Sequence, residues 1–295
     1  MALTECDLLI NLGSRFDDRL ASKPDAFAPN AKIVHVDIDP SEINKVIQTD
    51  LGIVADCKLV LEALSSENVT TAHHEEWIHY CKQNKQKHPF KYDKNEDDTF
   101  SKPQKSIEYI GKITNGDAIV TTDVGQHQMW AAQFYPFKDH GQWVTSDGLG
   151  TMGFGIPSAI GAQLASPDKT VVCFVGDGGF QMTNQEMALL PEYNLNVKIV
   201  LINNGTLGMV KQWQDKFFNQ RFSHSVFNDQ PDFIKMAEAY GINGYLIDSS
   251  DKLESQIDAA FNHNGPALIE VRISPVEPVN PMVPSGKSNH EMEGL

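Results

Sequence analysis

The sequence predicts an α/β protein whose larger part is a doubly wound parallel sheet. Residues 170–175 and 198–202 are short runs rich in β-branched residues, which are typical of buried strands. Between them, residues 183–190 begin with a threonine and an asparagine that can cap a helix, and apolar residues follow. This order indicates a right-handed crossover between two parallel strands, whose carboxyl ends then meet at one edge of the sheet.

Helical and strand-like segments alternate through the rest of this region. We expect helices near residues 107–113, at 127–134 and at 156–165, and a strand at 118–122. After the central unit the pattern continues with residues 231–240, 245–247, 250–261 and 267–273. Such alternation is typical of a doubly wound sheet. The tail from Ser274 is rich in proline and is expected to be extended.

The first part of the chain predicts a second, truncated α/β domain over residues 1–81. Residues 7–12 and 32–39 are expected to be strands, and residues 58–64 a helix. Almost nothing precedes the first strand, so we expect this domain to lack its beginning. Residues 82–105 are polar, contain two prolines and indicate a linker. The ligand-binding domain would then cover residues 106–295, including the extended tail.

Composition excludes several classes of function. With 295 residues, 41% of them hydrophobic, the chain can bury a large core. A net charge of −15 argues against nucleic acid or an anionic membrane surface as a partner. No apolar stretch is long enough for a membrane span, and the start has no signal-peptide pattern. Cys6, Cys57, Cys81 and Cys173 lack metal or redox spacing, which fits a cytoplasmic protein.

Asp177 and Asn204 are the strongest candidates for ligand binding. Asp177 follows the first central strand in the run Gly176-Asp177-Gly178-Gly179, and Asn204 follows the second. A carboxylate, an amide oxygen and a loop carbonyl leave room for phosphate oxygens and water around Mg²⁺. We therefore predict a magnesium and diphosphate site. Either piece alone is equally consistent with a tight turn or a helix cap.

Two further glycine-containing segments suggest anion binding. Residues 148–153 match G-x-G-x-x-G, which allows a dinucleotide site as an alternative. The segment before it, residues 142–146, is short and polar for a first central strand, which argues against that alternative. Met152 within it is either a core residue or an apolar ligand contact. Residues 123–127 pass from a strand into a helix, whose free N–H groups attract phosphate.

Longer stretches of the sequence resemble one protein family. Residues 123–134 (DVGQHQMWAAQF), 148–162 (GLGTMGFGIPSAIGA) and 203–213 (NNGTLGMVKQW) resemble the large catalytic subunit of acetohydroxyacid synthase, also called acetolactate synthase. The similarity extends to residues 12–19 (LGSRFDDR) and 34–43 (VHVDIDPSEI) of the family's central domain, and so covers nearly the whole chain. It implies the thiamine diphosphate-binding fold for the doubly wound part.

The resemblance implies a role for each residue around that cofactor. Asp177, Asn204 and the backbone carbonyl of Thr206 would hold Mg²⁺. Met152 would lie between the two cofactor rings, and Met209 and Trp213 would line the substrate pocket. Arg19 would bind the carboxylate of a second 2-keto acid, a task suited to guanidinium. The other residues expected to contact thiamine diphosphate are Val124, Gly125, Gln126, His127, Gly150, Gly176, Gly178, Gly179, Leu207 and Gly208.

A second cofactor follows from the same resemblance. Residues in the family segments that touch FAD, which is required there without a net redox role, are Gly13, Arg15, Asp17, Asp37 and Asp56. Without the resemblance, these aspartates are equally typical of strand ends and loops.

The implied reaction is the decarboxylation of pyruvate and the joining of the remaining unit to pyruvate or 2-ketobutyrate, in branched-chain amino-acid synthesis. The family also implies a homodimer or tetramer and a small regulatory subunit.

The chain departs from the family in two places. Asp147 stands where the family usually has glycine, which would place a negative charge near the phosphate site. No segment here matches the family's pyrimidine-binding domain, whose glutamate activates the cofactor. Three interpretations therefore stay open: a synthase catalytic chain or part of one, another thiamine diphosphate-dependent 2-keto acid decarboxylase, or an inactive cofactor-binding module.

Overall fold

The computed structural model describes residues 2–67, 73–94 and 99–294. The chain forms two compact units. The smaller contains residues 1–91 and 280–295, and the larger contains residues 92–279.

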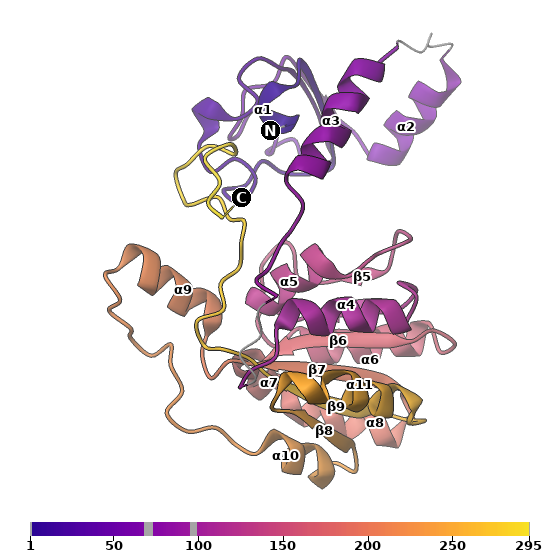
Figure 1. The fold of residues 1–295 in the computed structure, drawn as a ribbon. Coiled ribbons are helices and arrows are strands. Elements are labelled where there is room, and N and C mark those ends of the chain that lie inside the picture. The colour runs from indigo at the N-terminus through magenta and orange to yellow at the C-terminus, as the bar shows by residue number, and fades with distance from the viewer. Residues whose placement is uncertain (1, 68–72, 95–98, 295) are drawn as a thin grey trace. The chain divides into compact units, whose positions relative to one another are not determined.

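A six-stranded parallel sheet forms the centre of the larger unit, with the strand order β5-β4-β6-β7-β9-β8 (Figure 1). Its central strands β6 and β7 are buried almost throughout, as expected for parallel strands covered on both faces. The strands are β4 (Ile119–Thr122), β5 (Trp143–Val144), β6 (Val171–Gly176), β7 (Val197–Asn203), β8 (Asn243–Ile247) and β9 (Ala267–Arg272).

Helices cover both faces of this sheet, which confirms the doubly wound fold. One core cluster includes residues of α4 (Pro103–Ile113), α5 (Gln126–Phe134) and α11 (Leu253–Asn262). The cluster on the opposite face includes residues of α6 (Gly155–Ala165), α7 (Asp177–Thr183), α8 (Leu189–Glu192) and α10 (Phe233–Ala239). Consecutive β6 residues alternate between the two clusters, because side chains along a strand point to opposite faces.

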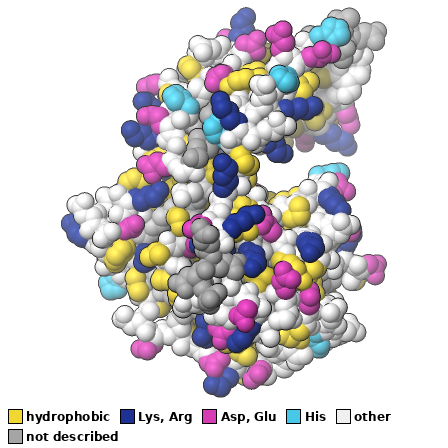
Figure 2. Space-filling view, in the orientation of Figure 1, with side chains coloured by type: hydrophobic (Ala, Val, Ile, Leu, Met, Phe, Trp, Pro, Cys, Tyr) yellow, Lys and Arg dark blue, Asp and Glu magenta, His cyan; other side chains and the backbone are white. Residues whose placement is uncertain are grey.

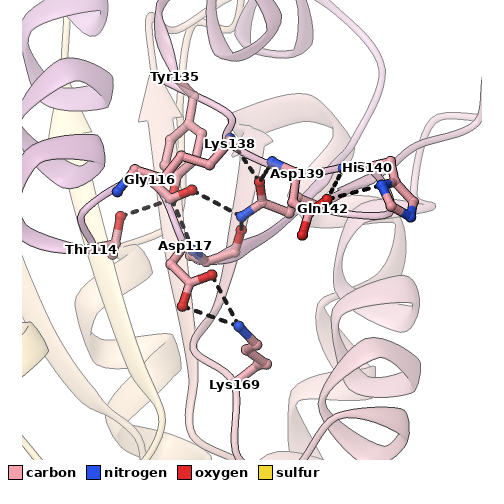
Figure 3. Close-up of polar contacts among 10 residues, drawn as sticks. Thr114, Gly116, Asp117, Tyr135, Lys138, Asp139, His140, Gln142 and Lys169 are labelled. Atoms are coloured by element: carbon pink, nitrogen blue, oxygen red, sulfur yellow. Dashed lines mark hydrogen bonds and ion pairs between the residues drawn. The ribbon is translucent and has the colours of Figure 1, made fainter.

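Gln142 ties the start of β4 to the loop before β5 (Figure 3). Its amide nitrogen donates to the carbonyls of Gly116 and Ala118, and its oxygen accepts from the backbone N–H groups of Lys138 and Asp139. All four contacts are 3.2 Å or shorter. The polar character of residues 142–146 thus reflects an edge position, since β5 pairs with β4 over two residues.

The expected crossover helix at residues 183–190 was misplaced. The α-helix α7 begins at Asp177, residues Asn184–Ala188 form a 3-10 helix, and α8 follows. A tight turn over Gly176 to Gly179 is one interpretation of the sequence, because glycines lower helix propensity. In the structure α7 begins there, and glycine is required at position 179, since a Cβ would lie 2.2 Å from Oδ1 of Asp123.

The expected linker at residues 82–105 also differs from the structure. Helix α3 (Glu75–Lys87) occupies its first part, and α4 begins at Pro103; residues 95–98 lie outside the described part of the chain. Acidic residues in the first turn of α3 and lysines in its last favour this polar helix. Helix α9 (Gly208–Phe217) was not predicted as an element.

The smaller unit has a three-stranded parallel sheet in the order β1-β2-β3. Its strands are β1 (Leu8–Leu12), β2 (Lys32–Asp37) and β3 (Leu51–Val54), and its other helices are α1 (Ala2–Glu5), α2 (Cys57–Ser66) and the 3-10 turn Pro24–Ala26. One sheet face packs on a small core that includes Phe16, Phe27 and Ile33. On the other face Leu8, Ile10 and Leu51 are about half exposed.

The tail divides after Val279, which corrects the expected domain boundary. Residues 280–295 belong to the smaller unit, where the N–H of Gly286 donates to Oγ of Ser22 and the Asn289 amide donates to the carbonyl of Leu20. Residues 274–279 stay with the larger unit.

Two surface properties complete the description. Within the described ranges, no helix is both long and apolar enough to cross a membrane. On the face drawn in Figure 2, basic and acidic side chains are interspersed.

Candidate cofactor site

A cavity lies at the carboxyl edge of the large sheet, where α/β proteins bind ligands. It is formed by the ends of β6 and β7 and by the first turns of α5, α7 and α9. It brings together most of the residues that the sequence predicted for the diphosphate and the metal. These are Val124, Gly125, Gln126, His127, Met152, Gly176, Asp177, Gly178, Gly179, Asn204, Thr206, Leu207, Gly208 and Met209.

Asp177 supplies a buried carboxylate to this cavity and is only 2% exposed. Its Oδ2 accepts from the Gln230 amide at 2.7 Å, and its Oδ1 accepts from the N–H of Gly178 at 3.0 Å. Burial raises the pKa of Asp177 to about 6, against the partly compensating hydrogen bonds from Gln230 and from backbone N–H groups. These partners are neutral, and a bound cation would stabilise the ionised carboxylate.

Asn204 is held in one orientation. Its Nδ2 donates to Oε1 of Gln126 at 3.0 Å, while its Oδ1 accepts from the N–H and the hydroxyl of Thr206. Glycine is required beside this pair, because a Cβ on Gly208 would lie 2.0 Å from Oε1 of Gln126. The first turn of α9 therefore closes over the two amides.

His127 is buried in the first turn of α5, at 6% exposure. Its ring contacts the backbone of Asp123, and its Nε2 has no partner within the described structure. Burial lowers the pKa of His127 to about 4, against the opposing effect of the Asp123 carboxylate. An unpaired, buried polar atom at a helix N-terminus is the kind of group that a phosphate would satisfy.

Asp123 lies in the segment predicted to bind an anion, residues 123–127, but no role of its own was predicted for it. It follows β4, is fully buried, and accepts from the N–H of Gly155 at 3.0 Å through Oδ2. Its Oδ1 lies against Gly179 and has no hydrogen-bond partner in the described structure. Asp123 thus joins β4 to the first turns of α6 and α7. Its place at the end of a predicted strand and the start of the anion-binding segment was the signal in the sequence.

Gln230, Gln212 and Glu277 were also missed. Gln230 bonds Asp177, Gln212 bonds Gln126, and the carbonyl of Glu277 accepts from Gln126 at 3.2 Å. They lie in loops, in the unpredicted helix α9 and in the tail, where sequence periodicity gives no information.

Met152 is partly buried and belongs to neither core cluster of the larger unit. It lines the cavity, and its Cε would be 3.8 Å from a Cβ on Gly178. This position favours a ligand contact over core packing. Gly150 does not line the cavity; it has a φ of +71° in the loop that precedes Met152.

Trp213 does not line this cavity; it lies in a second pocket along α9 with Val210 and Phe218. Met209 lines both that pocket and the cofactor cavity. Met209 and Trp213, the two residues predicted for the substrate pocket, therefore form one apolar wall.

The residues predicted for FAD and the second substrate all lie in the smaller unit. Gly13 has a φ of +67°, and its N–H donates to the carbonyl of Val36. Asp17 lies 3.6 Å from Arg15 and accepts from the N–H of Arg19, while Asp56 caps α2 through the N–H of Lys58. These contacts give both aspartates local structural roles.

Asp37 is 8% exposed and accepts from the N–H of Asp39 at 2.8 Å. Arg19 forms a 2.7 Å ion pair with Asp18 at the surface. These contacts of Asp37 and Arg19 do not identify a ligand, so the roles assigned to them stay predictions.

A doubly wound sheet with a glycine-lined cavity at its carboxyl edge defines an α/β protein that binds a phosphate-bearing cofactor. The family described as "Thiamine pyrophosphate enzyme, C-terminal TPP binding domain" matches residues 123–271. The family described as "Thiamine pyrophosphate enzyme, central domain" matches residues 1–64. The chain belongs to the thiamine pyrophosphate enzymes.

The chain is similar to acetolactate synthase large subunits. The chain is 51% identical over 295 residues to the acetolactate synthase large subunit of Lactococcus lactis subsp. lactis (strain IL1403), covering 100% of this chain and 51% of that protein. It is 44% identical over 291 residues to the acetolactate synthase isozyme 2 large subunit of Escherichia coli (strain K12), covering 99% and 52%. It is also 44% identical over 301 residues to the large subunit of Cyanidium caldarium, covering 100% and 51%. The chain spans about half the length of the curated relatives it matches.

Proposed function

We propose that this chain is the carboxyl-terminal part of an acetolactate synthase catalytic subunit, and that its larger unit binds the diphosphate of thiamine diphosphate through Mg²⁺. The observation that carries the proposal is the convergence of Asp177 and Asn204, which follow neighbouring strands, on one cavity. The similarity to acetolactate synthase large subunits supports the choice of reaction.

The residues present fit a magnesium ion. Asp177 keeps unused acceptor capacity, because a carboxylate has about four lone-pair sites and two donors are described for its side chain. Asn204 offers its oxygen on the Thr206 side, where the Thr206 hydroxyl can rotate away from a cation. With the backbone carbonyl of Thr206, these groups are the oxygen ligands that Mg²⁺ prefers. Among the described residues no cluster of three His, Cys, Asp or Glu forms another metal site.

The surrounding backbone fits the diphosphate. The first turns of α5, α7 and α9 line the cavity and present free N–H groups. The N–H groups of Gly125 to His127 and of Gly179 would bind phosphate oxygens, and Nε2 of His127 would gain a partner. An anion beside the imidazole favours its protonated form, which donates from both nitrogens.

Thiamine diphosphate, when bound, supplies the electron sink for the loss of carbon dioxide from a 2-keto acid. The chain's own contribution is to orient and shield that reaction. Met152 would support the cofactor rings, and the apolar wall of Met209 and Trp213 would exclude water around pyruvate. Arg19 would recognise the carboxylate of the acceptor, pyruvate or 2-ketobutyrate.

The remaining expectations belong to the same proposal. FAD would bind the smaller unit near Gly13, Arg15, Asp17, Asp37 and Asp56. We also propose that the protein forms a homodimer or tetramer, binds a small regulatory subunit and is cytoplasmic. Asp147 is exposed on the loop before the cavity, so its charge can remain in solvent.

A cofactor-binding but inactive module is the second candidate, because no glutamate of this chain matches the one that activates the cofactor in the family. A 2-keto acid decarboxylase is less consistent with the similarity to acetolactate synthases, which extends over 99–100% of this chain.

Calorimetry tests the proposed binding. Thiamine diphosphate should bind the chain in the presence of Mg²⁺ and bind much more weakly after chelation. The variant Asp177→Ala should lose the magnesium dependence, whereas Asp117→Ala, which removes a surface partner of Lys169, should keep it. Equal binding by the wild type with and without Mg²⁺ would refute the proposed metal site.

A further inference from the structure

Two side-chain amides lead from residues 277–279 to the proposed metal ligand Asn204. Gln212 lies on α9, and Gln126 is the first residue of α5. Both are more than nine-tenths buried. Each hydrogen bond along this path is 3.2 Å or shorter.

The path begins at the backbone of Val279, which fixes the orientation of Gln212. The N–H of Val279 donates to Oε1 of Gln212 at 2.9 Å, and Nε2 of Gln212 donates to the Val279 carbonyl at 3.2 Å. A backbone N–H can only donate and a carbonyl can only accept. Rotating the Gln212 amide by half a turn would place its NH₂ group against the N–H of Val279 and its oxygen against the Val279 carbonyl.

Gln126 is oriented in turn by two acceptors. Its Nε2 donates to Oε1 of Gln212 at 2.7 Å and to the carbonyl of Glu277 at 3.2 Å. Its amide nitrogen must therefore face the tail, and its oxygen faces Nδ2 of Asn204 at 3.0 Å.

This leaves one orientation for Asn204. Its nitrogen faces Gln126, so its oxygen faces Thr206, where it accepts from the N–H at 3.1 Å and the hydroxyl at 3.0 Å. Only the oxygen of an amide can ligate a cation. A reversed Asn204 would present its NH₂ group to a metal.

We propose that Gln212, held by the backbone of Val279, is a positioning residue that acts through Gln126 to keep the oxygen of Asn204 directed at the cation. The inference rests on the proposed role of Asn204 as a magnesium ligand. It assigns residues 277–279 a task at the cofactor site, although they lie outside the cavity lining.

The packing supports this assignment. A Cβ on Gly208 would lie 2.0 Å from Oε1 of Gln126 and 2.6 Å from Nδ2 of Asn204. The first turn of α9 thus encloses the contact between the two amides, and α9 also carries Gln212. One helix both confines the pair and supplies the group that orients it.

The first test compares two variants that each remove a buried amide. In Gln212→Leu, the Mg²⁺ concentration needed for half-maximal thiamine diphosphate binding should rise up to about 10-fold, the lower end of the effect of losing a direct partner of a metal ligand, because Gln212 acts through Gln126. In Gln163→Leu, the amide lost is one on α6 that donates to the carbonyls of Ser166, Pro167 and Lys169. This control should lose stability without a change in the Mg²⁺ requirement.

A second measurement needs no cofactor. Hydrogen exchange of the Asn204 side-chain amide should be slow in the metal-free wild type, faster in Gln212→Leu and unchanged in Gln163→Leu. If the wild type shows no magnesium-dependent binding, the proposed function fails, and this measurement still tests the positioning role.

Two results would overturn the inference. One is a Gln212→Leu variant with the wild-type magnesium requirement and wild-type exchange at Asn204. The other is fast exchange of the Asn204 amide in the wild type, a measurement that stands even if the variant does not fold. Gln212→Glu is a second variant that keeps the acceptor for Gln126 but places an oxygen against the Val279 carbonyl; its magnesium requirement should also exceed that of the wild type.

Discussion

At the scale of single residues, the site combines buried polar groups that are costly without a ligand. The carboxylate of Asp177 is buried among neutral donors, and Nε2 of His127 has no partner in the described structure. Burial of an unpaired charge or polar atom opposes folding. Such groups are therefore expected to gain more from the cofactor than the surrounding backbone does.

Asp177→Asn should stabilise the metal-free protein at neutral pH. The folded-state pKa of Asp177, about 6, is above its ordinary value of 3.8. The stability contributed by its protonation is therefore full below pH 3.8 and is lost as pH rises through 6. A side chain that cannot ionise should gain up to about 3 kcal/mol above that range.

Chemical denaturation of the two proteins without metal at about pH 7.5 and about pH 4 measures this effect, and the gain should be small at the lower pH. The same variant should lose the stabilisation that Mg²⁺ with thiamine diphosphate gives the wild type. A variant that is less stable than the wild type at both pH values would contradict the assigned burial cost.

At the scale of elements, the central strands could be predicted and the helix starts could not. Residues 171–175 and 199–202 are apolar on both faces of the strand, and this pattern can be recognised without knowing which elements pack against them. Helix α7 was hidden because its glycines suit both a turn and a crowded helix start. The difference depends on Asp123, which is distant in sequence from Gly179 and adjacent in space.

The same limit applies to the site. The positions of Asp177 and Asn204 follow from strand order and handedness alone. Gln212 and Gln230 are ordinary polar residues in the sequence, and only tertiary contacts place them beside the ligands. Roles such as that of Met152 came from the family resemblance.

Gly208→Ala should impair the first turn of α9. Its Cβ would approach the amides of Gln126 and Asn204 well below contact distance, so one of them must move. We expect magnesium-dependent thiamine diphosphate binding to weaken by at least about tenfold, the lower end for a disturbed metal ligand shell.

Gly161→Ala is the matched control. Gly161 lies within α6, and a Cβ there meets nothing within 4 Å. This change should leave binding intact and stabilise the protein by roughly 0.5–1 kcal/mol, because alanine favours helix more than glycine. Calorimetry and thermal unfolding of the two variants separate the two effects, and equal binding by both would show that the cavity tolerates the extra methyl group.

At the scale of the whole molecule, the two units differ in how completely they are packed. The larger sheet is covered on both faces, whereas the small sheet leaves Leu8, Ile10 and Leu51 about half exposed, and no residue described in α2 or α3 is buried. Parallel sheets are normally covered on both faces. The fold class of each unit followed from the sequence, but the division of the tail at Val279 depends on contacts with Ser22 and Leu20.

The 295-residue chain should form negligible acetolactate from pyruvate when purified alone, even with thiamine diphosphate, Mg²⁺ and FAD. The resemblance assigns the activating glutamate to a pyrimidine-binding domain that no part of this chain matches. The Lactococcus lactis relative is 51% identical to this chain over the half that the two proteins share. Co-expression of this chain with the other, amino-terminal half of that relative should restore measurable turnover. Robust turnover by the chain alone would contradict the assignment.

The contact of Asp123 with Gly155 and Gly179 limits which residues can replace these two glycines. At Gly179 only a hydrogen atom fits against the carboxyl group, since an added Cβ would lie 2.2 Å from Oδ1 of Asp123. At Gly155 an added Cβ would meet the backbone nitrogen of Asp123 at 2.9 Å and its Cβ at 3.1 Å. The residues that positions 155 and 179 can accept therefore depend on Asp123. Directed evolution that replaces Gly179 alone will meet a loss, whereas a double substitution that also shortens the side chain at position 123 can be tolerated. Gly155 is not relieved in this way, because it lies against the backbone of Asp123.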